Sequence, residues 1–157
     1  MNYLLDTNVV IIYSKDNDLS RKIEQKYRLF AKENNLAISI VTVAEINSLV
    51  HQLRIGKARK ANLDRMLNKI YQVDISSVDI LQKYEEIDAF SQCKHKEIKS
   101  PFSTPRNMGK NDLWIAATAS ALGVPLVTTD KDFMHLDKMF VDVVYVDISK
   151  HRKKSIK

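Results

Sequence analysis

Cysteine, glycine and proline are all scarce in this chain of 157 residues. The single cysteine, Cys93, cannot form a disulfide within the chain and excludes a cysteine-rich zinc site, which fits a reducing compartment. With only three glycines and three prolines, we expect mostly regular elements and few long loops. No apolar run approaches the ~20 residues that a membrane span needs, and the first residues lack the pattern of a signal peptide. We therefore expect a cytoplasmic protein without a membrane segment.

Positive charge is concentrated at one end of the chain. The formal net charge is +6, but residues 150–157 hold five Lys or Arg and no acid, so residues 1–149 carry only +1. Hydrophobic residues make up 45% of the chain, which is enough to build a core. We expect one folded domain over residues 1–149 and a basic tail over 150–157. The tail either attracts polyanions without sequence specificity or is a solvated end that helps solubility.

Apolar periodicity switches repeatedly between strand-like and helix-like spacing. Strands are predicted over residues 3–5, 37–41, 73–75, 125–128 and 143–146. Helices are predicted over 9–13, 19–32, 42 to near 56, 58–70, 77–90 and 111–122, with one long loop over 96–109. This alternation predicts an α/β fold with a parallel sheet of about five strands, covered on both faces. Right-handed crossovers bring the C-terminal ends of the strands to one edge, where such folds bind ligands.

Acidic residues follow the predicted strands at this edge. Asp6 ends the first strand, and Glu45 lies in the helix after the second. Asp112 begins the alanine-rich helix 111–122, and Asp130 follows the fourth strand, with Asp132 two residues further on. Carboxylates gathered without basic partners repel one another unless a proton or a cation neutralises them. Because carboxylate oxygens bind hard divalent cations, which support phosphodiester hydrolysis, the pattern predicts a metal centre.

Each acid also has a structural explanation. Asp6 can cap a helix, Thr42 and Glu45 have the spacing of a capping box, and the helix dipole favours Asp112 in a first turn. Taken singly, these explanations are at least as good as a metal site. The metal hypothesis depends on the combination, in which four separate elements each bring a carboxylate to the same edge.

Four segments resemble the PIN-domain family, especially the VapC-type toxins of bacterial toxin–antitoxin pairs. In order along the chain they are LLDTN at 4–8, TVAEI at 42–46, NDLWIAATA at 111–119 and LVTTDKDF at 126–133. The resemblance implies a three-layer α/β/α sandwich, a site for Mg²⁺ or Mn²⁺, and endonucleolytic cleavage of RNA, with tRNA or another structured RNA as the target. It also implies two protein partners, a cognate antitoxin and a second copy of the chain.

The resemblance assigns roles to individual residues. The metal-binding and catalytic acids would be Asp6, Glu45, Asp112 and Asp130, with Asp132 joining them or orienting water. The polar supports of these carboxylates would be Thr7, Asn8, Thr128 and Thr129.

Three basic residues flank the acids and are predicted to contact the RNA backbone: Arg106, Lys110 and Lys131. The loop 96–109 lies beside Asp112 and is longer and richer in proline than we expect for the family. We therefore expect this loop to influence the choice of substrate.

Two alternative functions remain open at this point. One is a PIN nuclease that processes RNA, or acts on DNA, without an antitoxin. The other is a receiver-like signalling module, which also has an α/β fold and an acidic Mg²⁺ pocket. A receiver needs a phospho-accepting Asp at the end of its third strand and adjacent acids after its first. Here serines follow residues 73–75 and Asp6 has no acidic neighbour, so the sequence favours the nuclease.

Overall fold

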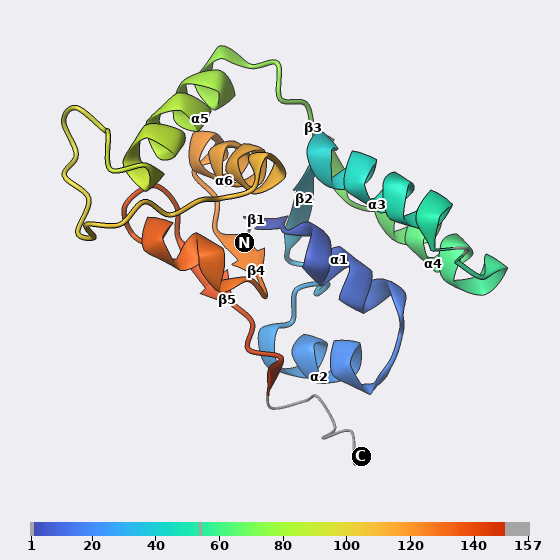
Figure 1. Ribbon diagram of the computed structural model, residues 1–157. Coiled ribbons are helices and arrows are strands. Elements are labelled where there is room, and N and C mark those ends of the chain that lie inside the picture. The colour runs from blue at the N-terminus through green and yellow to red at the C-terminus, as the bar shows by residue number, and fades with distance from the viewer. Residues whose placement is uncertain (1, 54, 150–157) are drawn as a thin grey trace, which may run out of the picture.

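A computed structural model describes residues 2–53 and 55–149, so the predicted tail over 150–157 lies outside the described residues. Its five strands form one parallel sheet in the order β3-β2-β1-β4-β5 (Figure 1). The strands are β1 (Asn2–Leu5), β2 (Asn35–Ser39), β3 (Tyr71–Val73), β4 (Leu126–Thr128) and β5 (Val143–Tyr145). The helices are α1 (Thr7–Ser14), α2 (Asp18–Tyr27), α3 (Ile40–Gln52), α4 (Lys57–Leu67), α5 (Val78–Ser91), α6 (Lys110–Leu122) and the 3₁₀ helix η1 (Lys131–Leu136).

The sheet has an apolar cluster on each face, because successive strand residues point to opposite sides. Leu4 belongs to one cluster and Leu5 to the other, and Leu126 and Val127 divide in the same way. All four side chains are fully buried. Because neither face of such a strand is exposed to solvent, its sequence is a short continuous apolar run.

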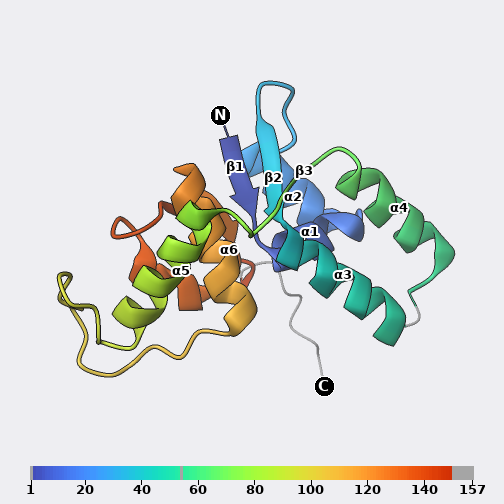
Figure 2. The same ribbon diagram turned by 90° about the horizontal axis from the view of Figure 1, so that it is seen from above.

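Helices cover both faces of the sheet, and Figures 1 and 2 show the two groups on opposite sides. The face of Leu4 packs against α5, α6 and η1, through residues such as Phe90 and Phe133. The face of Leu5 packs against α1, α2, α3 and α4, through residues such as Ile46 and Leu63. The predicted three-layer α/β/α sandwich is therefore confirmed. None of the helices in the described ranges is long and apolar enough to cross a membrane.

Helix α6 sits close to the sheet because its inner face is made of small residues. Ala116, Ala117 and Ala119 are fully buried, and α6 packs extensively against α5. The helix ends at Gly123, whose backbone is in the left-handed conformation (φ 62°) that favours glycine. This close packing holds the first turn of α6 over the sheet edge.

Several predicted boundaries were wrong by a few residues. The helix expected from residue 42 begins at Ile40, with Ser39 as its cap, so the predicted capping box at Thr42 does not exist. The helix expected over 19–32 ends at Tyr27, because Arg28 takes the left-handed conformation and stops it. The third strand is Tyr71–Val73 rather than 73–75, and η1 was not predicted.

We expect Leu113→Ala to lower the free energy of unfolding by about 2–5 kcal/mol, because it leaves a cavity in a fully packed layer. Leu122→Ala makes the same change on the same helix, where the side chain is exposed. It should cost less than about 1 kcal/mol. Urea unfolding of both variants measures the difference, and equal losses would contradict the described packing.

Candidate active site

The predicted acids do gather at the C-terminal edge of the sheet. Asp6 follows β1 directly, Glu45 lies in α3 after β2, and Asp130 follows β4. Asp112 lies in the first turn of α6, above the same edge. The charges of Asp112 and Glu45 act on Asp6, and those of Asp130, Glu45 and Asp132 act on Asp112. Five carboxylates from different elements therefore share one electrostatic environment.

Asp6 is the most buried member, with only 3% of its surface exposed. It occupies the cap position of α1, but its side chain makes no capping hydrogen bond, so the capping explanation fails. Burial, reinforced by the charges of Asp112 and Glu45, raises the pKa of its carboxyl from 3.8 to about 6. A hydrogen bond from Thr128 opposes this shift. The charged form of such a carboxyl is unfavourable at neutral pH. Binding a proton or a nearby cation therefore stabilises the folded chain.

Thr128 connects the acids at the ends of β1 and β4. Its hydroxyl donates to Asp6 Oδ2 at 2.8 Å and accepts from the backbone N–H of Asp130 at 2.9 Å. Asp130 in turn caps η1, since its Oδ1 accepts from the N–H of Asp132 at 2.9 Å. Thr128 is fully buried and hydrogen-bonded to Asp6, whereas Thr129 is partly exposed.

Glu45 is held by both of its carboxylate oxygens. The Thr7 hydroxyl donates to Oε2, and the Asn111 amide donates to Oε1 at 2.7 Å. Buried Thr42 lies behind this contact, with its Oγ1 3.2 Å from Oγ1 of Thr7. Glu45 therefore joins α1, α3 and α6, which is a different role from the capping box that its spacing suggested.

Asp112 is half-buried at the start of α6. Burial, together with the charges of Asp130, Glu45 and Asp132, raises the pKa of its carboxyl from 3.8 to about 6. The backbone N–H of Gly109 lowers it by hydrogen bonding. A Cβ at position 109 would lie 2.9 Å from Asp112 Oδ2, so a larger residue there would require this carboxylate to shift.

A groove of about 470 Å³ opens over the acids between α1, α3 and α6. Its walls include Asp6, Glu45 and Asp112, together with Asn8 and Asn111. Within residues 2–53 and 55–149, no three His, Cys, Asp or Glu side chains stand close enough together to ligate one metal ion. Mg²⁺ often needs only one or two carboxylates and fills its other positions with water and phosphate. The donor set and its uncompensated charge therefore fit a hydrated divalent cation.

The predicted basic residues divide into two groups. Lys110 turns toward α5, where its Nζ lies 3.9 Å from Asp88 Oδ2 and 5.9 Å from the centre of the Tyr84 ring. Arg106 and Lys131 instead line a cavity beside Asp132.

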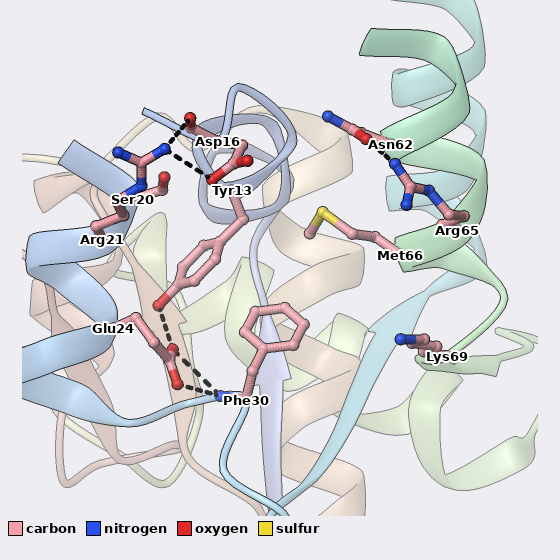
Figure 3. A pocket seen from close by; sticks show the side chains of 10 residues that line it. All are labelled: Tyr13, Asp16, Ser20, Arg21, Glu24, Phe30, Asn62, Arg65, Met66 and Lys69. Carbon is pink, nitrogen blue, oxygen red and sulfur yellow. Dashed lines mark hydrogen bonds and ion pairs between the residues drawn. The ribbon is translucent and has the colours of Figure 1, made fainter. Parts of the chain in front are cut away.

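A further hollow of about 430 Å³ lies between α1, α2 and α4 (Figure 3). Its two acids already have partners: Asp16 pairs with Arg21, and Glu24 accepts hydrogen bonds from Tyr13 Oη and the Phe30 N–H. Because these carboxylates are engaged, this hollow does not provide a second metal centre.

Sequence reasoning missed three residues of the site, Asn111, Gly109 and Thr42. Asn111 precedes Asp112 and was considered only as a helix start. The resemblance to the family pointed to Thr7. A search for a polar residue beside each predicted acid would also have found Asn111. No sequence signal distinguishes Thr42, because its role depends on the approach of α1 to α3.

A family model for the PIN domain matches residues 3–139. The chain belongs to the PIN-domain family. Curated relatives of this PIN domain include Ribonuclease VapC2 of Rickettsia felis, 28% identical over 144 residues, covering 90% of this chain and 97% of the relative. Another is Ribonuclease VapC1 of Haemophilus influenzae, 27% identical over 139 residues, covering 87% and 92%.

Solved structures give the same result for the fold. The complex of VapBC2 from Rickettsia felis with a promoter DNA fragment contains a chain that superposes with a TM-score of 0.68 at 25% identity. The alignment covers 94% of this PIN domain and all of that chain. VapBC-5 from Mycobacterium tuberculosis gives a TM-score of 0.61 at 22% identity, with 92% and 98% coverage.

Without divalent cations, we expect the free energy of unfolding of this PIN domain to fall as the pH rises from about 4 to above 6. The raised pKa of Asp6 means that the folded chain binds more protons than the unfolded chain in this window, so stability decreases with pH. The loss attributable to Asp6 is on the order of 3 kcal/mol.

Urea unfolding in chelator across this pH range tests the expectation. Asp6→Asn should flatten the decline, whereas Asp64→Asn, at an exposed position on α4, should leave it unchanged. If the free energy of unfolding of Asp6→Asn declines with pH as steeply as that of the wild type, the raised pKa of Asp6 is not the cause of the decline.

Proposed function

We propose that this protein is a metal-dependent endoribonuclease that serves as the toxin of a toxin–antitoxin pair. The observation that carries the proposal is the set of five carboxylates at one sheet edge, where burial and the neighbouring charges raise the pKa of Asp6 and Asp112. The PIN fold and the relatives named as VapC ribonucleases support the same activity. The neighbouring VapBC structures support a cognate antitoxin, which would act by covering the acidic groove.

Asp6 and Asp112 are the residues that would hold Mg²⁺ or Mn²⁺, with Asp130 and Asp132 adding negative charge beside them. A divalent cation bound there supplies an activated water and charge stabilisation for the displaced oxygen of a phosphodiester. The carboxylates do not act as nucleophiles in this proposal. Their part is to concentrate negative charge where a cation and a phosphate meet.

The surrounding residues keep the carboxylates in place. Thr128 fixes the orientation of Asp6 from β4, while Thr7 and Asn111 fix Glu45 from α1 and α6. Glu45 is thereby aimed into the groove, where it can accept a proton from water without losing its position. The exposed Asn8 lies on the groove wall with Asp6 and Asp112, where it would act as a polar support of the site.

The receiver-like alternative gains no support. Its phospho-accepting Asp would be Asp74 after β3, which is the edge strand of the sheet. The Asp74 carboxylate accepts a hydrogen bond from the Ser76 N–H at 2.8 Å and lies outside the acidic groove.

We expect Asp6→Asn and Asp112→Asn to lower the rate of RNA cleavage by about a hundredfold or more, because each removes a carboxylate that holds the cation. Both variants should fold, since Asn keeps the shape of Asp and removes a repelled charge. Inducible expression of the wild type and of Asp6→Asn, with mapping of new RNA ends, measures the effect and identifies the target.

Asp64→Asn is the matched control, and it should cleave like the wild type. Cleavage by the wild type in saturating chelator, or full activity in Asp6→Asn, would refute the metal-dependent mechanism. Growth arrest that a small protein encoded beside the gene relieves would separate a toxin from a nuclease without an antitoxin.

Asn111→Ala should reduce the apparent affinity for Mn²⁺ about tenfold, because Glu45, whose charge acts on both Asp6 and Asp112, loses one of the two donors that orient it. The free energy of unfolding should change by less than about 1 kcal/mol, since Asn111 is exposed. Titration calorimetry with Mn²⁺ measures the affinity, and Asn68→Ala, at an exposed position after α4, is the control. Equal affinities in the two variants would assign Asn111 no role at the metal site.

A further inference from the structure

A cavity of about 490 Å³ lies between the loop before α6 and the start of η1. Its lining comes from two short segments, Pro105–Met108 and Lys131–His135, with Phe133 alone turned away into the core. In Figures 1 and 2 the loop and η1 both lie on the side of the sheet that carries α5, away from α4. The acidic groove uses α1, α3 and α6, so the two hollows have different walls.

Buried Ser91, the last residue of α5, fixes the walls of this cavity. Its carbonyl accepts from the Arg106 N–H at 2.8 Å, and its hydroxyl lies 2.8 Å from His135 Nε2 and 3.8 Å from Met108 Sδ. One residue thus holds the loop through its carbonyl and η1 through its hydroxyl. The Gln92 amide adds a hydrogen bond to Asn107 Oδ1 at 3.2 Å. Hydrogen bonds from the end of α5 therefore hold both walls of the cavity in place.

The Ser91–His135 pair is structural. His135 Nδ1 lies 2.7 Å from the backbone carbonyl of Asp132, which can only accept, so Nδ1 carries the proton and Nε2 accepts from Ser91. Ser91 is 1% exposed, so no substrate reaches its hydroxyl. The pair resembles a serine nucleophile with its base, yet its effect is to set the position of η1.

The cavity adjoins the acidic site through Asp132. This residue lines the cavity, and its charge also acts on Asp112. Its N–H is bound to Asp130, which follows β4. Asp132 thus lies between the acids and the cavity, so an RNA strand that binds a phosphate at the acids could extend a neighbouring nucleotide toward the cavity.

The side chains around the cavity suit a nucleotide. Arg106 and Lys131 supply two exposed cations for phosphate, and Arg106 also lies over the Phe102 ring at 5.4 Å. Met108 and Met134 offer apolar surface to a base, and Asn107 offers an amide to its edge. Guanidinium groups and apolar side chains contact unpaired bases in this way, while cations bind the backbone.

We propose that this cavity binds the unpaired nucleotide next to the scissile phosphate, so that the loop before α6 and η1 select the RNA sequence that is cut. The proposal rests on the ribonuclease activity proposed above. Arg106 is then a specificity-determining residue, and Lys131 binds the phosphate beside it. Ser91 and His135 are positioning residues, since they act through the loop and η1.

An abasic scan tests the proposal on an oligoribonucleotide that contains the mapped cleavage site. Each nucleotide around the site is replaced in turn by one without a base, and kcat/KM is measured with Mn²⁺. We expect one position next to the cut to lose about tenfold or more in the wild type, because stacking on the cavity walls is lost there.

Arg106→Gln and Arg28→Gln form a matched pair for the second measurement, because both remove one exposed arginine charge and Arg28 lies at the end of α2. Binding of an uncleavable RNA should weaken in Arg106→Gln, and the slope of log Kd against log salt should fall by about 0.7. The loss of kcat/KM at the sensitive abasic position should also be smaller in Arg106→Gln than in the wild type. Arg28→Gln should match the wild type in all three respects.

Two results would overturn the proposal. One is an abasic scan in which every position is equivalent, and the other is an Arg106→Gln variant that matches Arg28→Gln in affinity, salt slope and abasic response. In either case, cleavage that still requires Asp6 would leave the proposed ribonuclease standing. Cleavage that does not require Asp6 would instead remove the ribonuclease proposal itself.

Discussion

Repulsion between carboxylates at one edge of the sheet is the constraint on which the candidate site depends. Asp6 is almost fully buried beside Asp112 and Glu45, and the charges that act on it come from other acids. A folded chain tolerates this arrangement by keeping a proton or by binding a cation. The same feature therefore lowers the stability of the fold when the acids are ionised, and it provides negative charge that a divalent cation would neutralise.

A polar framework keeps the acids from moving apart. Thr128 joins the ends of β1 and β4, and Glu45 joins three helices through Thr7 and Asn111. The bond between Glu45 and Asn111 crosses from one face of the sheet to the other, because α3 covers one face and α6 covers the opposite one. The site is consequently part of the packing of the domain, and its geometry depends on the alanine-rich contact of α6.

The loop before α6 and η1 extend this framework away from the metal site. Ser91 ties both segments to the end of α5, so the cavity between them has fixed walls next to Asp132. The acids that would bind the cation are thereby separated from the residues that would select the RNA. Such a division lets the loop vary among related nucleases while the reacting centre stays the same.

The sequence by itself determined the strand order along the chain, the sandwich and the acids at the sheet edge. It did so because buried parallel strands leave short apolar runs, and the topology of such sheets sends every strand end to one side. Only the tertiary structure decided what holds each acid. Asn111 meets Glu45 across 66 residues and His135 meets Ser91 across 44, and contacts so distant leave no local pattern. Thr42 shows the same limit, because its capping-box spacing was satisfied in the sequence while Ser39 caps the helix in the fold. Local spacing predicts which residues follow a strand, but the approach of separate helices settles which atoms touch.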